Sequence, residues 1–394
     1  MKLIESVLIG SSLLVAYGIG FYYHTPELSI ESKKWLASAE APFDPTKKAR
    51  LEQISARLDE LKVSRHGTDC YPDELTAKCY LASKGQPDSV EELESRQLYR
   101  EIINLMPYVP DPAQGFWYAP AYHHMFQGAR SEYYLELRQG ELDQETVRYY
   151  LSHLQRWLEH PESTLEAVIA LALHNVSLVA INLSLGVGQQ DLDLEGLQGL
   201  IGVNVSLEKM VLKELRSTVF YINQTPQYNY RNKENWFVDH QRMYLQNQLS
   251  FFEQEPLEYW RRDLELDGHW YAELTEWLIV TFSNEEHYLD KASMEKQSLD
   301  YLDYYRAKQH HHLVLLALAN VYQGATIEDH GIEAPEMWRW EWKPEELELC
   351  LELRDDVTGI RELNEGWVLC LPHVQLQLAA LQDVSLDKSI EPAS

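Results

Sequence analysis

Apolar residues recur every three or four positions through most of the chain, which is the spacing of one face of an α-helix. Near the start, Leu51, Ile54 and Leu58 form such a stripe. Asp44 and Pro45 precede it. This pair is typical of a helix start, because Asp accepts hydrogen bonds from free backbone N–H groups and Pro has no N–H to satisfy. The pattern therefore predicts a helix that begins directly after Asp44.

The same period predicts helices over most of the middle of the chain. A second helix start is expected at Asp88, with Glu91 three residues later as in a capping box. The segment 163–186 is apolar almost all round, which predicts a helix at the centre of a bundle. Its His and Asn residues argue against a membrane span. Further helices are predicted at 143–160, 206–222, 235–254, 269–282 and 294–323.

The period changes to two near the C-terminus. In the segment 346–353 Leu alternates with Glu and Cys, as in a half-buried strand, although Pro344 also fits a helix start. The segment 359–372 fits a hairpin whose turn, 364–366, ends in a Gly. The sequence therefore predicts a small β meander that closes the helical body.

The N-terminal segment 6–23 carries no charge, and about 18 such residues are long enough to span a bilayer as a helix. It ends in Phe21, Tyr22 and Tyr23, aromatic residues of the kind found at membrane interfaces. A cleaved signal peptide is the alternative, but no small-x-small cleavage site follows. Long domains translocate largely regardless of the charge balance around the span. We therefore expect a single-pass anchor whose body faces the periplasm.

The expected architecture is mainly α: an N-terminal transmembrane helix followed by an irregular multi-helix bundle with a small C-terminal β meander. Its parts are a membrane anchor over 1–25, a helical periplasmic domain over 26–335 and a β-containing cap and tail over 336–394. No repeat of fixed period is visible, so a solenoid is not expected.

Charge narrows the classes of partner. The chain holds 34 basic and 62 acidic residues, a formal net charge of -28 that is spread along its length. Such a surface repels nucleic acid phosphates and anionic lipid headgroups. Nucleic acid is therefore excluded as a partner, and the predicted contact with the membrane is through the N-terminal helix.

The chain has four cysteines, Cys70, Cys79, Cys350 and Cys370. Neither local couple has the two-residue spacing of a zinc knuckle or a thioredoxin-like motif. In an exported domain, two local disulfides are the economical interpretation: Cys70 with Cys79, and Cys350 with Cys370. Four cysteines allow three pairings, and the sequence does not choose among them.

The chain shows no familiar catalytic constellation. His310, His311 and His312 are consecutive, and on a helix consecutive residues point about 100° apart, so they do not share one face as metal ligands. A solvated or capping run is expected instead. The glycosylation sequences at Asn175 and Asn182 lie in the apolar segment 163–186, where a glycan does not fit. We expect no metal and no cofactor.

One long loop is a candidate recognition surface. Over the segment 223–237, aromatic rings alternate with amide side chains, a mixture that could line a polar groove for a glycan or a peptide. The alternative is an inter-helix loop folded over the bundle, with its rings buried and its amides satisfying its own backbone. The candidate partner-binding residues are Tyr228, Tyr230, Trp236 and Phe237.

Three features together resemble a group of proteobacterial envelope proteins with one N-terminal membrane helix and a helical periplasmic body. They are the anchor, the segment "STLEAVIALALHNVSLVAINL" and the tail "RDDVTGIRELNEGWVLCLP". The resemblance implies a bacterial inner-membrane address and brings no assigned activity. The cysteines and the aromatic run "MWRWEWKP" do not match the group.

These observations favour a binding or scaffolding component of the cell envelope over an enzyme. Its partner would be another envelope protein or a glycan. The alternative is a carbohydrate-active or other hydrolase with a carboxylate pair in a helical cleft, drawn from the many acidic residues. Glycosidases hold two such carboxyl groups roughly 5 to 10 Å apart.

Overall fold

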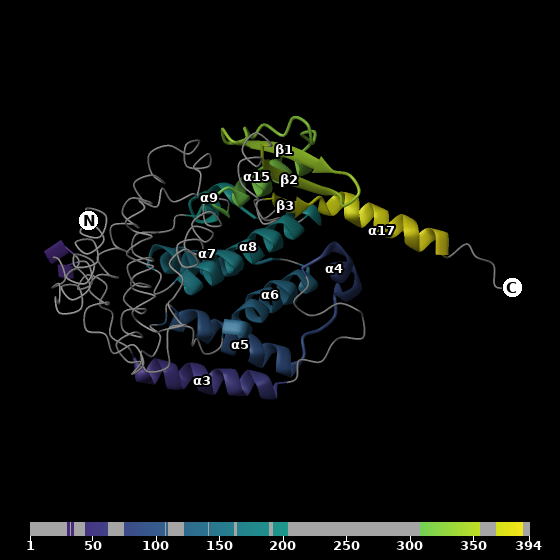
Figure 1. Ribbon diagram of the computed structural model, residues 1–394. Coiled ribbons are helices and arrows are strands. Elements are labelled where there is room, and N and C mark those ends of the chain that lie inside the picture. Colours follow the sequence, from purple (N-terminus) through teal and green to yellow (C-terminus); the bar gives the residue numbers. More distant parts are fainter. Residues whose placement is uncertain are drawn as a thin grey trace, which may run out of the picture.

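The computed structural model describes residues 30, 31, 33, 34, 44–61, 75–106, 108, 122–140, 142–160, 164–188, 192–203, 308–354 and 368–388. The described part is mainly helical, with a small antiparallel sheet near the C-terminus, as predicted (Figure 1). The predicted membrane anchor, 1–25, lies outside these residues. The helices are α3 (Pro45–Glu60), α4 (Ala77–Ser83), α5 (Val90–Leu105), α6 (Tyr122–Gln139), α7 (Gln144–Glu159), α8 (Thr164–Gly186), α9 (Leu194–Ile201), α15 (His311–Tyr322) and α17 (Val374–Lys388). The strands are β1 (Trp338–Lys343), β2 (Glu348–Leu353) and β3 (Val368–Pro372).

Local sequence signals set the ends of the first helices. The Asp44 side chain accepts hydrogen bonds from the backbone N–H groups of Thr46 and Lys47, so it caps α3 as predicted. The capping box of α5 is one residue later than predicted, because Ser89 is the N-cap and Glu92 its partner. Asp88 does not cap the helix, since its carboxylate accepts a hydrogen bond from Arg138 instead.

Helix α8 is the centre of the bundle. It packs against α6, α7 and α15, and also contacts α17 and β3. Among the described helices, the segment Glu166–Gly186 is the one long and apolar enough to cross a membrane, and 72% of its most apolar window is buried inside the molecule. This burial confirms the prediction of a central core helix.

The sheet has the order β1-β2-β3, with both neighbouring pairs antiparallel. Leu349, Leu351 and Leu353 of β2 are buried and alternate with the half-buried Glu348 and Glu352, which is the predicted period of two, although Cys350 between the two glutamates is buried as well. The strand begins two residues later than the predicted start at residue 346. The preceding residue, Leu347, has φ 54°, a left-handed conformation that ends the turn after β1. The predicted turn at 364–366 lies outside the described residues.

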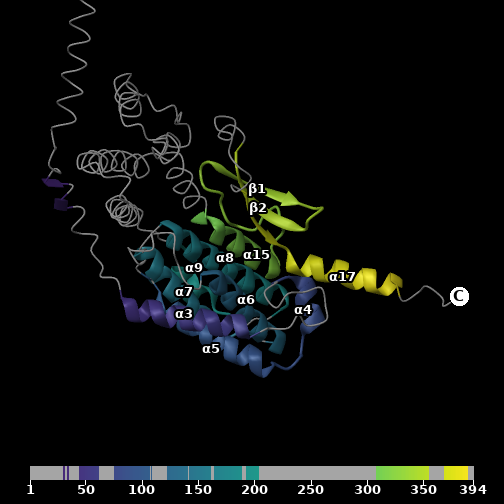
Figure 2. The same ribbon diagram turned by 60° about the horizontal axis from the view of Figure 1, so that its bottom comes forward.

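The sheet and the helices share one hydrophobic core. Trp338 of β1 and Leu371 of β3 belong to the same buried cluster as Trp157 of α7 and Leu171 of α8. Figure 2 shows the strands beside α15, with α17 leaving the end of β3 and extending away from the bundle. The sheet is therefore part of the same folded body as the helices.

Candidate functional site

A buried network of charged side chains joins α5, α6 and α7. Glu132 is fully buried on α6, with an exposed fraction of 0%. Its Oε1 accepts hydrogen bonds from Arg96 Nε at 2.9 Å and from Arg100 Nε at 2.6 Å. Arg96 Nη2 also donates to Oε1 of Glu136 at 2.5 Å. Two carboxylates one helical turn apart are thus held by two arginines of the neighbouring helix.

Helix α7 completes this network. The Tyr150 hydroxyl donates to the second oxygen of Glu132, and the Thr146 hydroxyl donates to Oε1 of Glu136 at 2.8 Å. The backbone N–H of Asp143 donates to the other oxygen of Glu136 at 3.2 Å. Burial raises the pKa of Glu136, and the hydrogen bond from Thr146 partly offsets this rise.

These contacts bear on the alternative of a hydrolase with a carboxylate pair. Glu132 and Glu136 are a buried pair of carboxylates, the residue types that the alternative needs. A general acid or base must, however, present an oxygen to the substrate. All four oxygens of this pair accept hydrogen bonds from the protein itself. The pair therefore acts as a structural clamp between three helices.

A second polar junction joins α8, α15 and the sheet. His311 is buried, and its Nδ1 lies 2.8 Å from Oδ1 of Asn175 while its Nε2 lies 3.2 Å from the carbonyl oxygen of Cys370. Burial, together with the nearby Lys308, lowers the pKa of His311 to about 3. The expectation of a solvated or capping His run is therefore wrong for His311, because this side chain connects three elements of the core.

Other polar residues of α8 also connect this helix to neighbouring elements. Asn182 Nδ2 donates to the carbonyl of Pro372 at 2.8 Å, and the Tyr322 hydroxyl donates to Asn182 Oδ1 at 3.1 Å. The Tyr322 oxygen in turn accepts from the backbone N–H of Val374 at 3.0 Å. His174 Nε2 lies 3.2 Å from the carbonyl of Leu200, and burial lowers the pKa of His174 to about 4. The polar residues within the apolar sequence of α8 are thus the positions where other elements form hydrogen bonds with this helix.

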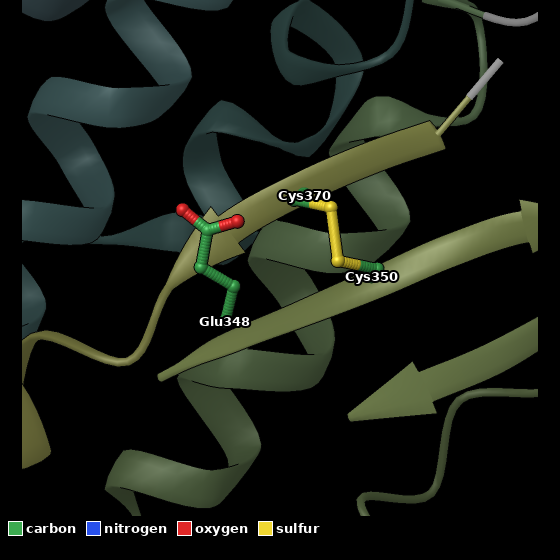
Figure 3. Close-up of side chains that lie close together, drawn as sticks. All are labelled: Glu348, Cys350 and Cys370. Atoms are coloured by element: carbon green, nitrogen blue, oxygen red, sulfur yellow. A yellow bond between two sulfur atoms is a disulfide. The ribbon is translucent and has the colours of Figure 1, made fainter. Parts of the chain in front are cut away.

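The third polar group lies on the face of the sheet opposite the leucines. Cys350 of β2 and Cys370 of β3, one of the two predicted pairs, are directly opposite in the register and joined by a disulfide, with Cα atoms 4.1 Å apart. The Glu348 carboxylate lies beside this bond, as Figure 3 shows. One carboxylate oxygen and both sulfur atoms lie within 4.8 Å of one another. Within the described residues, this is the one group whose spacing could hold a metal ion.

The charges around this group differ from one glutamate to the next. Glu352, on the same face of β2, is paired with Lys343 at 3.2 Å and with Arg339 at 3.7 Å. Glu348 has no such pair within the described part of the chain. Burial raises the pKa of Glu348, and the neighbouring Glu346 adds to the rise while Lys343 opposes it.

The remaining predicted site residues have different outcomes. Cys79 is buried and in a disulfide, whereas its predicted partner Cys70 lies outside the described residues. The candidate partner-binding residues Tyr228, Tyr230, Trp236 and Phe237 also lie outside them. Comparison with known proteins finds no family model that matches the chain, and no similar curated protein or solved structure.

Proposed function

We propose that the chain is a single-pass, membrane-anchored protein whose helical body lies in the periplasm and binds another component of the cell envelope. The observation that supports this address is the oxidised state of the cysteines. Cys79, Cys350 and Cys370 are all in disulfides. Disulfides persist in oxidising compartments and are rare in the cytosol, where thiols are kept reduced.

The anchor in this proposal is the uncharged segment 6–23. A single pass agrees with the burial of α8, because that helix is used as the core of the body. The net charge of -28 suits a solvated exported domain that does not bind anionic lipid headgroups.

Binding is favoured over catalysis by the state of the buried polar groups. Glu132 and Glu136 are committed to arginine, tyrosine and threonine donors, and His311 is committed to Asn175 and the Cys370 carbonyl. None of these groups is placed to react with a substrate. The partner surface that we propose is the loop after Asn223, with Tyr228, Tyr230 and Trp236 as its contact residues.

The address is tested by trapping thiols in growing cells. Acid quenching followed by alkylation with a maleimide of large mass adds one visible shift for each free thiol. We expect no shift for the full-length protein without reductant and four shifts after reduction, one for each cysteine of the chain. Peptide mapping without reductant should link Cys350 to Cys370 and Cys70 to Cys79. Four free thiols in rapidly quenched cells would contradict the proposed compartment.

A further inference from the structure

Strand pairing places the two sulfur atoms side by side on the face of the sheet opposite the leucines, where Cys350 is fully buried and Cys370 is half-buried. Cys350 and Cys370 are partners in the antiparallel register, and the neighbouring pairs, Leu349 with Leu371 and Leu351 with Leu369, are buried in the core. This buried leucine face holds β2 against β3 whether or not the disulfide is present. Reduction would therefore leave two thiols facing each other on neighbouring strands.

That arrangement fits the dimensions of a tetrahedral metal site. Two zinc–sulfur bonds of about 2.3 Å at a tetrahedral angle separate the sulfur atoms by roughly 3.7 Å. The Cα atoms of Cys350 and Cys370 are 4.1 Å apart, and a pair this close allows this sulfur separation with small side-chain rotations. An oxygen of Glu348 already lies within 4.8 Å of both sulfur atoms.

Glu348 is also the carboxylate that is available on this face. Its side chain is half-buried, and within the described residues it forms no ion pair, whereas Glu352 is paired with Lys343 and Arg339. Figure 3 shows the carboxylate on the same side of the strands as the disulfide. Two thiolates with one carboxylate are ligands that suit zinc-like cations, not the all-oxygen sites of magnesium or calcium.

We propose that reduction of the Cys350–Cys370 disulfide opens a site for a thiophilic divalent cation of the zinc type, with both thiolates and the Glu348 carboxylate as ligands and water in the fourth position. A dithiol or phosphine reductant supplies two electrons and is itself oxidised, while the two sulfur atoms take up two protons. Metal binding then releases those protons, because thiolates are the ligands. The disulfide is the form of the protein that does not bind the metal. This inference departs from the expectation of no metal, and it does not depend on the proposed compartment.

The test uses the full-length chain in detergent, reduced with a phosphine under anaerobic conditions and titrated with Co²⁺. Thiolate ligation gives sulfur-to-cobalt charge-transfer absorption, and Zn²⁺ should displace the cobalt and abolish that absorption. We expect the absorption in the reduced chain and in Cys70→Ser/Cys79→Ser, and its absence in the oxidised chain and in Cys350→Ser/Cys370→Ser. If Cys350→Ser/Cys370→Ser keeps the absorption of the reduced chain, the proposal is wrong.

A matched pair of variants tests the third ligand. Glu348→Gln should weaken Zn²⁺ binding by roughly 10- to 100-fold, at least as much as losing an outer-shell partner costs. Glu352→Gln removes a charge from the same face of the same strand, and its Zn²⁺ affinity should stay close to that of the unmodified chain. Equal affinities in the two variants would show that Glu348 is not a ligand and would overturn the proposed ligand set.

Discussion

Replacing Glu132 by Gln should destabilise the helical body strongly, although the two side chains have nearly the same shape. The change removes the negative charge that two arginines and Tyr150 share in the interior. Arg96 and Arg100 then have no charged partner at Glu132, while Arg96 keeps its contact with Glu136.

The magnitude follows from the burial of each partner. Breaking a buried ion pair by removing one partner costs about 3 to 5 kcal/mol. The Glu132 side chain is fully buried, but those of Arg96 and Arg100 are 25% and 40% exposed and regain some hydration. We therefore expect the lower end, about 3 kcal/mol. With an unfolding entropy of about 2.1 cal/mol/K per residue over the 394-residue chain, this loss lowers Tm by about 4 °C.

The assay is thermal unfolding of the full-length protein in detergent, followed by far-UV circular dichroism at neutral pH. The matched control is Glu94→Gln, which removes an exposed carboxylate that accepts a hydrogen bond from Arg57 at 2.7 Å. Exposed pairs of this kind contribute little to stability, so the control should unfold close to the unmodified protein. If Glu132→Gln lowers Tm no more than Glu94→Gln does, the network is not the clamp that we describe.

Three further predictions concern pH, close helix packing and the candidate loop. The pKa of His311 falls from 6.5 to about 3 on folding, so its contribution to the unfolding free energy is fully present above about pH 6.5. This contribution is lost as the pH falls toward 3, by up to about 1.4 kcal/mol per pH unit, because the unfolded chain binds the proton more readily. The unfolding free energy of His311→Gln, measured by chemical denaturation, should depend less steeply on pH. An unchanged pH dependence would contradict a buried neutral ring. Gly128→Ala should cost about 1 to 3 kcal/mol, because the added Cβ would lie 2.4 Å from the Tyr99 ring, whereas Gly199→Ala meets nothing within 4 Å and should stabilise its helix by about 0.5 kcal/mol. Denaturant midpoints that move in the same direction for both glycine variants would refute this contrast. Replacing Tyr228, Tyr230 and Trp236 of the candidate loop by Ala should abolish capture of an envelope partner with Tm nearly unchanged. A drop of about 3 to 5 kcal/mol or more in the free energy of unfolding would show that these rings are core residues.

The apolar period identified the helices whose buried stripe is simple. It located α3, α7 and α8, because each begins with a clear start signal or carries a long apolar run. It missed α6, whose buried residues include Glu132, Glu136 and Arg138. A hydropathy pattern assigns charged residues to the solvent-facing side of a helix. Their burial here depends on partners from other helices, which lie far away in the sequence.

The strands of the sheet were also predicted only in part. The alternation of Leu with Glu and Cys predicted β2, and the final strand of the predicted hairpin corresponds to β3. The strand β1 was missed, although Trp338, Trp340 and Trp342 alternate with charged residues in the aromatic run "MWRWEWKP". That alternation was a usable signal.

Burial of the candidate chemistry could not be predicted from spacing. His311 faces Asn175, 136 residues away, and Asn182 faces Pro372, 190 residues away. Such contacts come from the packing of α8 against α15 and the sheet. The grouping of Glu348 with the disulfide depends on the strand register as well as on the cysteine pairing, so the sequence shows the three residues without their arrangement.

The central claim is that the body lies outside the cytoplasm on a single membrane span, and reporter fusions test it most directly. Alkaline phosphatase, which is active only after export, and a fluorescent protein that matures only in the cytoplasm are each fused after Leu61 and after Ser394. We predict phosphatase activity without fluorescence at both junctions, because α8 is a core helix and does not return the chain across the membrane. Fluorescence without phosphatase activity after Leu61, or opposite results at the two junctions, would contradict the account.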